Sequence, residues 1–228
     1  MNKPKLTKRL QTAGAMVREG SFVADVGTDH AYLPIALLAE GRIRGGVVSD
    51  INKGPILRAS EHLREYGMEG KLTPVLCDGL SALEPYAPED ILILGMGGEL
   101  IAKILSDAPW VKTQGRRLIL QPMTHPERLR RFLGEEGFEI LDEALVKEEK
   151  IYQIILAEYS GKPRQYHEEE LLFGPVNLAR GGELLSELLD HWESVLWERI
   201  QGKERALADT REEREFLKKM EELRHEDP

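Results

Sequence analysis

Acidic residues and glycines recur where short apolar runs end, and together they could hold a cationic ligand. The run Phe22–Val26 contains Asp25 and is followed by Gly27, and two later runs end in Asp50 and in Asp78. A carboxylate accepts several hydrogen bonds, for example from a diol, and a glycine lets a ligand approach the backbone closely. Because the carboxyl ends of parallel strands share one edge of a sheet, we expect these residues to form one ligand site.

The turn after Gly27 carries Asp29 at the start of an expected helix. A dinucleotide-binding Gly-x-Gly-x-x-Gly turn would have glycines where Asp29 and Tyr32 stand, and it would place a pyrophosphate against the Asp29 carboxylate. S-adenosylmethionine (SAM) carries a sulfonium and an ammonium, which a carboxylate stabilises. The motif therefore favours SAM over NAD. Capping of the helix is the alternative role for Asp29, and the two roles are compatible.

Five strand–helix units are expected to position these residues. The expected strands are Phe22–Val26, Val47–Asp50, Thr73–Gly79 with Pro74 at its start, Asp90–Leu94 and Arg117–Leu120. The uninterrupted apolar run of the fourth strand indicates a central place in the sheet. A helix over residues 6–17 precedes the first strand, and Pro34 is expected in the first turn of the helix that follows it, where its missing N–H costs nothing.

The alternation stops at Phe138–Val146 and Ile151–Tyr159, which only four residues separate. That link is too short for a parallel crossover, so these two strands are predicted to form a hairpin. A mostly parallel α/β sheet with an antiparallel last strand resembles the Rossmann-like fold of class I SAM-dependent methyltransferases.

After Gly161 the apolar pattern becomes helical, with one stripe over Leu184–Leu196 and another over Leu207–Leu223. We expect two long antiparallel helices, an α-helical hairpin of coiled-coil type. The chain is thus predicted to have a methyltransferase domain over residues 1–161 and a helical domain over residues 162–228.

The composition restricts the function classes. The net charge of −9 argues against a nonspecific nucleic-acid binder, yet the first eighteen residues contain five basic residues and no acidic one. Such a segment can form a local basic surface on an acidic protein. One cysteine, no apolar run of the roughly 18 residues that span a bilayer, and scattered histidines indicate a cytoplasmic protein without a disulfide framework, a membrane segment or a metal site. We expect a monomer.

Five motifs in chain order resemble those of the bacterial tRNA (adenine-22-N1)-methyltransferases. They are Asp25–Pro34, Asp50 with Asn52–Pro55, Asp78–Gly79, Gly95–Gly98 and Gln121–Pro122. The C-terminal helical hairpin is also that family's layout. The resemblance implies SAM as the cofactor and N1 of an adenine in tRNA as the nucleophile. The SAM pocket that we expect from it consists of Asp25, Gly27, His30, Asp50, Ile51, Asp78, Gly79, Gly95 and Met96.

Methylation of adenine N1 needs no proton abstraction, because that atom already has an in-plane lone pair. The product is cationic, so we expect the Asp29 carboxylate to stabilise it, and His30 to shape the pocket or to bind the base or the SAM carboxylate. The residues expected to contact tRNA are Lys5, Lys8, Arg9, Gly97, Gly98, Gln121, Pro122 and Arg128, and Arg130 and Arg131 are further candidates for phosphate contacts. The alternatives are a class I methyltransferase acting on another RNA or on a small molecule, and a non-catalytic protein that binds SAM or tRNA.

Overall fold

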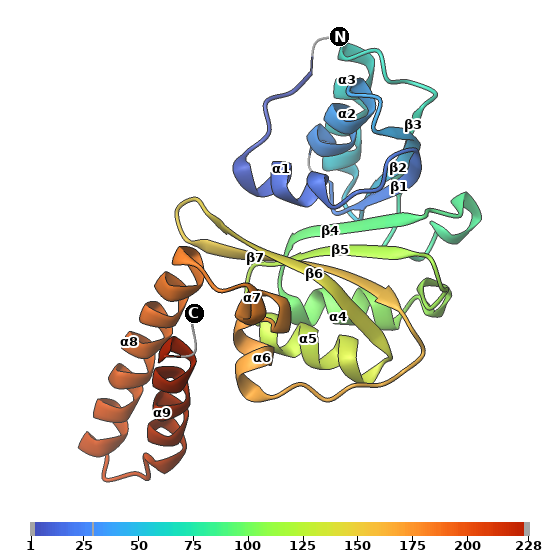
Figure 1. The fold of residues 1–228 in the computed structure, drawn as a ribbon. Coiled ribbons are helices and arrows are strands. Elements are labelled where there is room, and N and C mark those ends of the chain that lie inside the picture. The colour runs from blue at the N-terminus through green and yellow to red at the C-terminus, as the bar shows by residue number, and fades with distance from the viewer. Residues whose placement is uncertain (1–2, 29, 226–228) are drawn as a thin grey trace.

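The computed structural model describes residues 3–28 and 30–225. Its centre is a seven-stranded sheet in the order β3-β2-β1-β4-β5-β7-β6 (Figure 1). The strands are β1 Ser21–Val26, β2 Ile43–Asp50, β3 Leu72–Leu76, β4 Asp90–Met96, β5 Arg117–Pro122, β6 Phe138–Lys147 and β7 Ile151–Tyr159. Neighbouring strands from β3 to β5 pair in parallel, and β7 is antiparallel to both β5 and β6. The predicted Rossmann-like class I methyltransferase sheet, with its antiparallel strand from a terminal hairpin, is confirmed.

Helices cover both faces of the sheet, which explains the continuous apolar run of β4. One face carries α1 Lys8–Ala15, α2 Tyr32–Ala39 and α3 Lys53–Glu65, and the other carries α4 Gly98–Ser106 and α5 Pro126–Glu135 (Figure 1). Ile91 and Ile93 pack into the core on the α4–α5 side, whereas Leu92 between them packs on the α1–α3 side. Alternating side chains of a central parallel strand are therefore all buried. Two short 3-10 helices, Glu84–Tyr86 and Pro109–Val111, complete this part.

Pro74 lies in the middle of β3, so its expected place at the start of that strand was wrong. β3 is at the edge of the sheet and pairs only with β2. A proline without an N–H is tolerated there, because one side of an edge strand has no partner. Pro34 does lie in the first turn of α2, as predicted.

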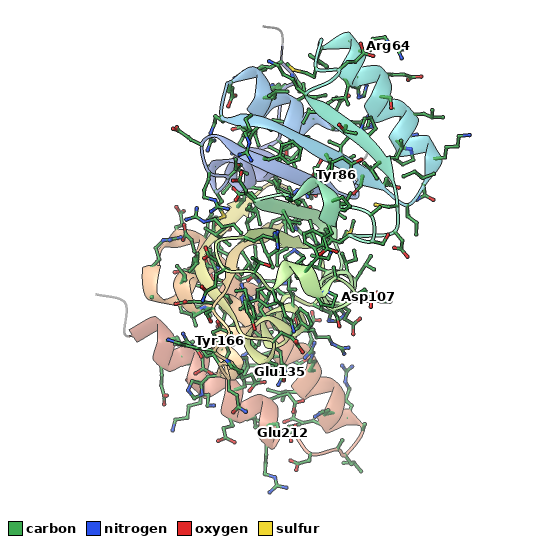
Figure 2. All side chains as sticks on the ribbon, turned by 90° about the vertical axis from the view of Figure 1, so that its right-hand side faces the viewer. Arg64, Tyr86, Asp107, Glu135, Tyr166 and Glu212 are labelled. Atoms are coloured by element: carbon green, nitrogen blue, oxygen red, sulfur yellow. The ribbon has the colours of Figure 1, made fainter. Side chains whose placement is uncertain are left out.

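The C-terminal region begins with two short helices, α6 Glu168–Phe173 and α7 Pro175–Arg180, which pack against α5 and β6. Two longer helices, α8 Glu183–Arg205 and α9 Arg211–His225, then form the predicted hairpin, which extends away from the sheet (Figure 1). Arg64 of α3 and Glu212 of α9 lie at opposite ends of the molecule (Figure 2). Leu207 does not belong to the apolar stripe expected for it: it lies in the turn between α8 and α9 and is 96% exposed.

A buried ion pair joins the helical region to the sheet. The side chains of Arg130 on α5 and Glu143 on β6 have no exposed surface and lie 2.8 Å apart. Arg130 also donates to Gln153 of β7 at 2.6 Å and to the carbonyl of Leu171 in α6 at 2.8 Å. Glu143 accepts a hydrogen bond from the backbone of Val176 in α7 at 2.9 Å. Arg130 therefore has an internal structural role, and the expectation that it contacts phosphate was wrong.

Candidate active site

The turn after β1 brings the backbone close to the end of β4. Gly27 has φ +75°, and a Cβ at this position would lie 2.0 Å from Cε of Met96. The amides of Gly27 and Thr28 both donate to the carbonyl of Ser49 on β2, at 2.8 and 2.9 Å. These contacts hold the backbone after β1 against the end of β2 and beside the Met96 side chain of β4. A side chain at residue 27 would be strained by its φ and would displace Met96.

Asp25 is the buried acid of this turn. Its side chain lies at the end of β1 with 8% of the residue exposed. Burial raises the pKa of the Asp25 carboxyl to about 6, and a hydrogen bond with the Thr28 side chain offsets part of that rise. A carboxylate held in an apolar environment is stabilised by an approaching cation. Asp25 therefore favours a positively charged ligand at the end of β1.

Asp50 and two exposed apolar residues form the next part of the edge. One carboxylate oxygen of Asp50 accepts the backbone N–H of Asn52 at 2.7 Å, which holds the side chain at the end of β2. Ile51 is 61% exposed, and Leu76 at the end of β3 is 55% exposed. The backbones are joined by a hydrogen bond of 3.1 Å from the amide of Cys77 to the carbonyl of Asp50. A carboxylate beside exposed aliphatic side chains suits a ligand with a sugar diol and a flat apolar base.

The other predicted acid, Asp78, follows β3 and is exposed. Gly79 comes next, and a Cβ there would contact Ile104 of α4 at 3.0 Å. The structure thus places the predicted residues at the ends of β1, β2 and β3 along one edge of the sheet, as their spacing indicated. Their roles in binding stay predictions.

The turn Gly95–Gly98 connects β4 to α4 and is held by the chain that follows β5. Met123 donates its N–H to the carbonyl of Met96 at 2.7 Å, and Gly98 donates to the carbonyl of Thr124 at 2.8 Å. A Cβ on Gly98 would lie 2.2 Å from the carbonyl oxygen of His125. The turn offers mostly backbone groups, with Met96 as its one long side chain. Its close contact with residues 123–125 explains why small residues occupy it.

Gln121 is the polar centre beneath this turn. It is fully buried, and its side-chain oxygen accepts the N–H of Gly95 at 3.1 Å and a hydrogen bond from the guanidinium of Arg9. Its amide nitrogen donates to the carbonyl of Pro122 at 2.9 Å. The Arg9 guanidinium also lies 5.2 Å from the centre of the Tyr152 ring. Arg9 therefore braces the end of β4 through Gln121, a role different from the phosphate contact expected from the sequence.

His30 lies in an aromatic cluster between the β1–α2 turn and α3. Its ring stacks on that of Tyr32 at a centroid distance of 5.0 Å, and the ring of His62 lies 5.2 Å away. Nδ1 of His62 is 3.0 Å from the carbonyl oxygen of His30. These contacts fix the position of the His30 ring, and its predicted roles stay predictions. Asp29, the other predicted catalytic residue, lies outside the described residues.

The basic N-terminal segment is only partly available to a ligand. Lys3 pairs with Glu40 at 2.6 Å, and the backbone N–H of Arg18 donates to the buried carboxylate of Asp90 at 2.8 Å, with the guanidinium also paired to it. Lys5 and Lys8 are exposed. Arg128 of α5 is exposed and pairs with Glu99 in the first turn of α4.

Three residues that the sequence did not single out lie beside the Gly95–Gly98 turn. Two basic side chains lie near the ring of Tyr152 in β7. Nζ of Lys150 is 5.2 Å from the ring centre, the same distance as the Arg9 guanidinium. A hydrogen bond to Glu149 raises the pKa of the Tyr152 phenol. His125 immediately precedes α5 and has φ +53°, a strained conformation for a non-glycine residue. Of these three residues, only Lys150 and Tyr152 could have been noticed in the sequence, as a basic residue at the end of the hairpin link and an aromatic residue just after it.

A model of a methyltransferase-domain family matches residues 6–155. The tRNA (adenine(22)-N(1))-methyltransferase of Bacillus subtilis is 32% identical, over 96% of this chain and 94% of its own length. The chain belongs to this methyltransferase family. A structure from Streptococcus pneumoniae, described as a putative tRNA (m1A22) methyltransferase, has a TM-score of 0.86 and 28% identity, covering 96% of this chain and 99% of its own. The B. subtilis m1A22 tRNA methyltransferase structure has a TM-score of 0.82 and 29% identity, covering 96% and 95%.

The helical hairpin is included in these family alignments, because each covers nearly the whole of both chains. Two further features concern the described residues alone. None of the helices within residues 3–28 and 30–225 combines the length and apolar character needed to cross a membrane. In the same part of the chain, the histidine, cysteine, aspartate and glutamate side chains form no group of three suited to a metal ion.

Proposed function

We propose that this protein transfers a methyl group from SAM to N1 of adenine 22 in tRNA. The observation that carries the proposal is the meeting of two features at Gly27 and Met96. On one side lies an acidic and apolar edge suited to a cationic nucleoside, and on the other lies a turn almost without side chains. The family relatives support the same reaction, because one is a tRNA (adenine(22)-N(1))-methyltransferase and the S. pneumoniae protein has been crystallised with SAM.

The residues at the ends of β1 and β2 fit SAM. Gly27 leaves the backbone without a side chain beside Met96, where a Cβ would lie 2.0 Å from Cε of Met96, and the buried carboxyl of Asp25 favours a cation nearby. We assign the ribose hydroxyls to Asp50 and the adenine of the cofactor to the exposed side chains of Ile51 and Leu76. SAM supplies an electrophilic methyl group on a sulfonium, and everything else required is placement by the protein.

The turn Gly95–Gly98 is assigned to the target adenine. Methyl transfer to a neutral ring nitrogen requires in-line placement within about 3 Å, which alone lowers a barrier by roughly 7–11 kcal/mol. Gln121 fixes the backbone at Gly95, and Met123 fixes it at Met96. A rigid turn without bulky side chains lets a base approach the backbone closely, and Met96 provides an adaptable apolar contact. We retain Asp29 as the carboxylate that stabilises the cationic product and His30 as the residue that shapes the pocket.

N1 lies on the pairing edge of adenine, so the base has to be unpaired before it reaches this turn. Contacts to tRNA phosphates offset the cost of exposing the base. We assign such contacts to the exposed side chains of Lys5 and Lys8, and to Arg128 if its pair with Glu99 opens. We further propose that the enzyme acts as a cytoplasmic monomer.

The test uses purified protein, radiolabelled SAM and a tRNA transcript, followed by nuclease digestion and mass analysis of the nucleosides. We expect 1-methyladenosine in a transcript with adenine 22 and none in a matched transcript with guanine 22. N6-methyladenosine as the sole product would refute the assignment to N1. Labelling of both transcripts would support a different RNA site, and SAM binding by calorimetry without labelling of any RNA would support a non-catalytic protein.

A further inference from the structure

A second cleft opens beside the Gly95–Gly98 turn and is separate from the edge assigned to SAM. It encloses about 470 Å³ between the chain that leaves β5, the start of β7 and the helical region. Residues 122–127 and 150–153 line it from the sheet, and residues of α6, α8 and α9 line it from the other side. A volume of this size accommodates a nucleotide.

The cleft is lined by the same chain segment that holds the turn. Pro122, its first lining residue, is the β5 partner of Met96 in the sheet register. The next residue, Met123, donates its N–H to the carbonyl of Met96 at 2.7 Å. The SAM edge lies on the other side of this turn, at the ends of β1 and β2. A nucleotide attached to a base on the turn can therefore lie on the β5 side without meeting the cofactor.

The cleft has an aromatic side chain on each wall. Tyr152 of β7 lines the sheet side, and the half-buried Trp192 of α8 lines the helical side. Trp192 is supported from below by Phe173, whose ring meets it edge-on at 6.4 Å, and Phe173 in turn stacks on Phe216 at 6.5 Å. The indole is thus held on a packed aromatic base. Such a ring is a platform on which an unpaired nucleobase stacks, whatever its sequence.

Basic and acidic side chains are unevenly distributed along the cleft. Lys150 lies at the end near the turn, where its ammonium donates to the carbonyl of Met123 at 3.1 Å. Arg199 lies farther along, with its guanidinium 5.9 Å from the centre of the Trp192 ring. Glu127 is paired with His125 at 3.0 Å. A neighbouring hollow is lined by Glu168, Glu212, Glu213 and Glu215 together with Arg199 and Lys219, and Glu168 also lines the cleft itself. A phosphate is therefore attracted near Lys150 and is repelled by the excess of carboxylates at the start of α9.

We propose that this cleft binds the unpaired nucleotide next to the methylated adenine, with its base stacked on Trp192 and its phosphate beside Lys150. The inference rests on the proposed function, since it takes an RNA strand as the substrate. It goes further in assigning a subsite, with a stated occupant, to residues outside the SAM edge and the target turn. Stacking of a base on an aromatic side chain changes affinity by about 5- to 150-fold.

The first test compares Trp192→Ala with Trp197→Ala in the full-length protein. Trp197 lies on the same helix and is 41% exposed, but it does not line the cleft, so it controls for the loss of a tryptophan from α8. We expect Trp192→Ala to raise the KM for tRNA and the Kd for tRNA by about 10-fold while the Kd for SAM stays the same. Trp192→Phe should restore most of the affinity. Equal tRNA parameters for the two alanine variants would overturn the proposal.

The second test does not depend on turnover or on the stability of the alanine variant. A protein with Trp110→Phe and Trp197→Phe keeps Trp192 as its one tryptophan. We expect tRNA to quench its fluorescence, and Lys150→Ala to weaken that titration and reduce its dependence on salt. Absence of quenching at saturating tRNA would overturn the subsite. Quenching by the adenine-22 transcript without methylation of that transcript by the wild-type protein would support the subsite while refuting the proposed function.

Discussion

Lys8 and Arg9 are adjacent at the start of α1, yet the structure predicts that their substitution changes different kinetic parameters. Lys8 is exposed, whereas Arg9 bonds to the buried Gln121 and covers Tyr152. We therefore expect Lys8→Glu to weaken tRNA binding and Arg9→Gln to slow methyl transfer. Both changes remove a positive charge from the same turn of helix, and Lys8→Glu also adds a negative one. Charge alone would make both variants weaken tRNA binding without slowing methyl transfer, so the pair tests the geometry.

The magnitudes follow from the contacts. Arg9→Gln removes a hydrogen bond in which the donor is charged, and such a bond contributes about 1.5–3 kcal/mol. If its full effect is on the placement of the Gly95–Gly98 turn, kcat falls about 10- to 150-fold, because each 1.36 kcal/mol is a factor of ten in rate. An exposed charge contributes at most about 1 kcal/mol to an ion pair. Lys8→Glu should accordingly raise the KM for tRNA about 5-fold.

Steady-state methylation of tRNA at several salt concentrations separates the two effects. For Lys8→Glu we expect an unchanged kcat and a salt slope of log KM lower by about one unit, as for the loss of one phosphate contact. For Arg9→Gln we expect an unchanged salt slope. Calorimetry with SAM and thermal melting serve as controls. The reasoning fails if Arg9→Gln raises the KM in the same salt-dependent way as Lys8→Glu and leaves kcat intact.

Three further predictions concern buried or partly buried charges. Asp50→Ala should weaken SAM binding in calorimetry about 10- to 150-fold, the loss expected for hydrogen bonds to a charged group, and a change below about 3-fold would contradict the ribose assignment. Because burial raises the pKa of Asp25 from 3.8 to about 6, its protonated form stabilises the fold at low pH and this stabilisation is lost as the pH rises through about 6. Asp25→Asn should therefore raise the urea midpoint of the ligand-free protein at pH 8 and not at pH 4, and an equal effect at both values would exclude this cause. Arg130→Met should lower the free energy of unfolding by about 3–5 kcal/mol, because Glu143 then remains buried without its partner. Arg130→Met with Glu143→Gln should recover part of that loss in urea denaturation, and additive losses would show that the pair is not coupled.

The fold was predictable because its signals are local. The run around Ile91–Ile93 is apolar at every position, and burial on both faces of the sheet follows from that. The hairpin of β6 and β7 followed from a link of four residues. Pro74 was misplaced because a strand's position in the sheet, which decides whether proline is tolerated within it, is a long-range property. Leu207 was misplaced because an apolar residue in a turn looks the same in sequence as one on a helix face.

The positions of candidate site residues were predictable where those residues lie at a strand end, as for Gly27 and Asp50, whose binding roles stay predictions. They were not predictable where two distant segments meet. Arg9 and Gln121 are 112 residues apart, and nothing near Arg9 distinguishes it from an exposed basic residue. Arg130 did carry a signal, because it lies on the same side of α5 as the buried Leu129 and Leu133. A charged residue on an apolar helix face indicates a buried partner, here Glu143.

The position of the Arg130–Glu143 pair has a mechanical consequence. The pair holds α6 and α7 against the sheet, so the part of the chain directly after residue 161 cannot swing independently. The next junction, between α7 and α8, consists of Gly181 with φ +65° and Gly182 with φ +102°. Two adjacent glycines have more conformational freedom than any other pair of residues, so they form the most flexible hinge in this part of the backbone. Any pivoting of the long arm toward or away from bound RNA would therefore start at residues 181 and 182, twenty residues later than the change in sequence pattern.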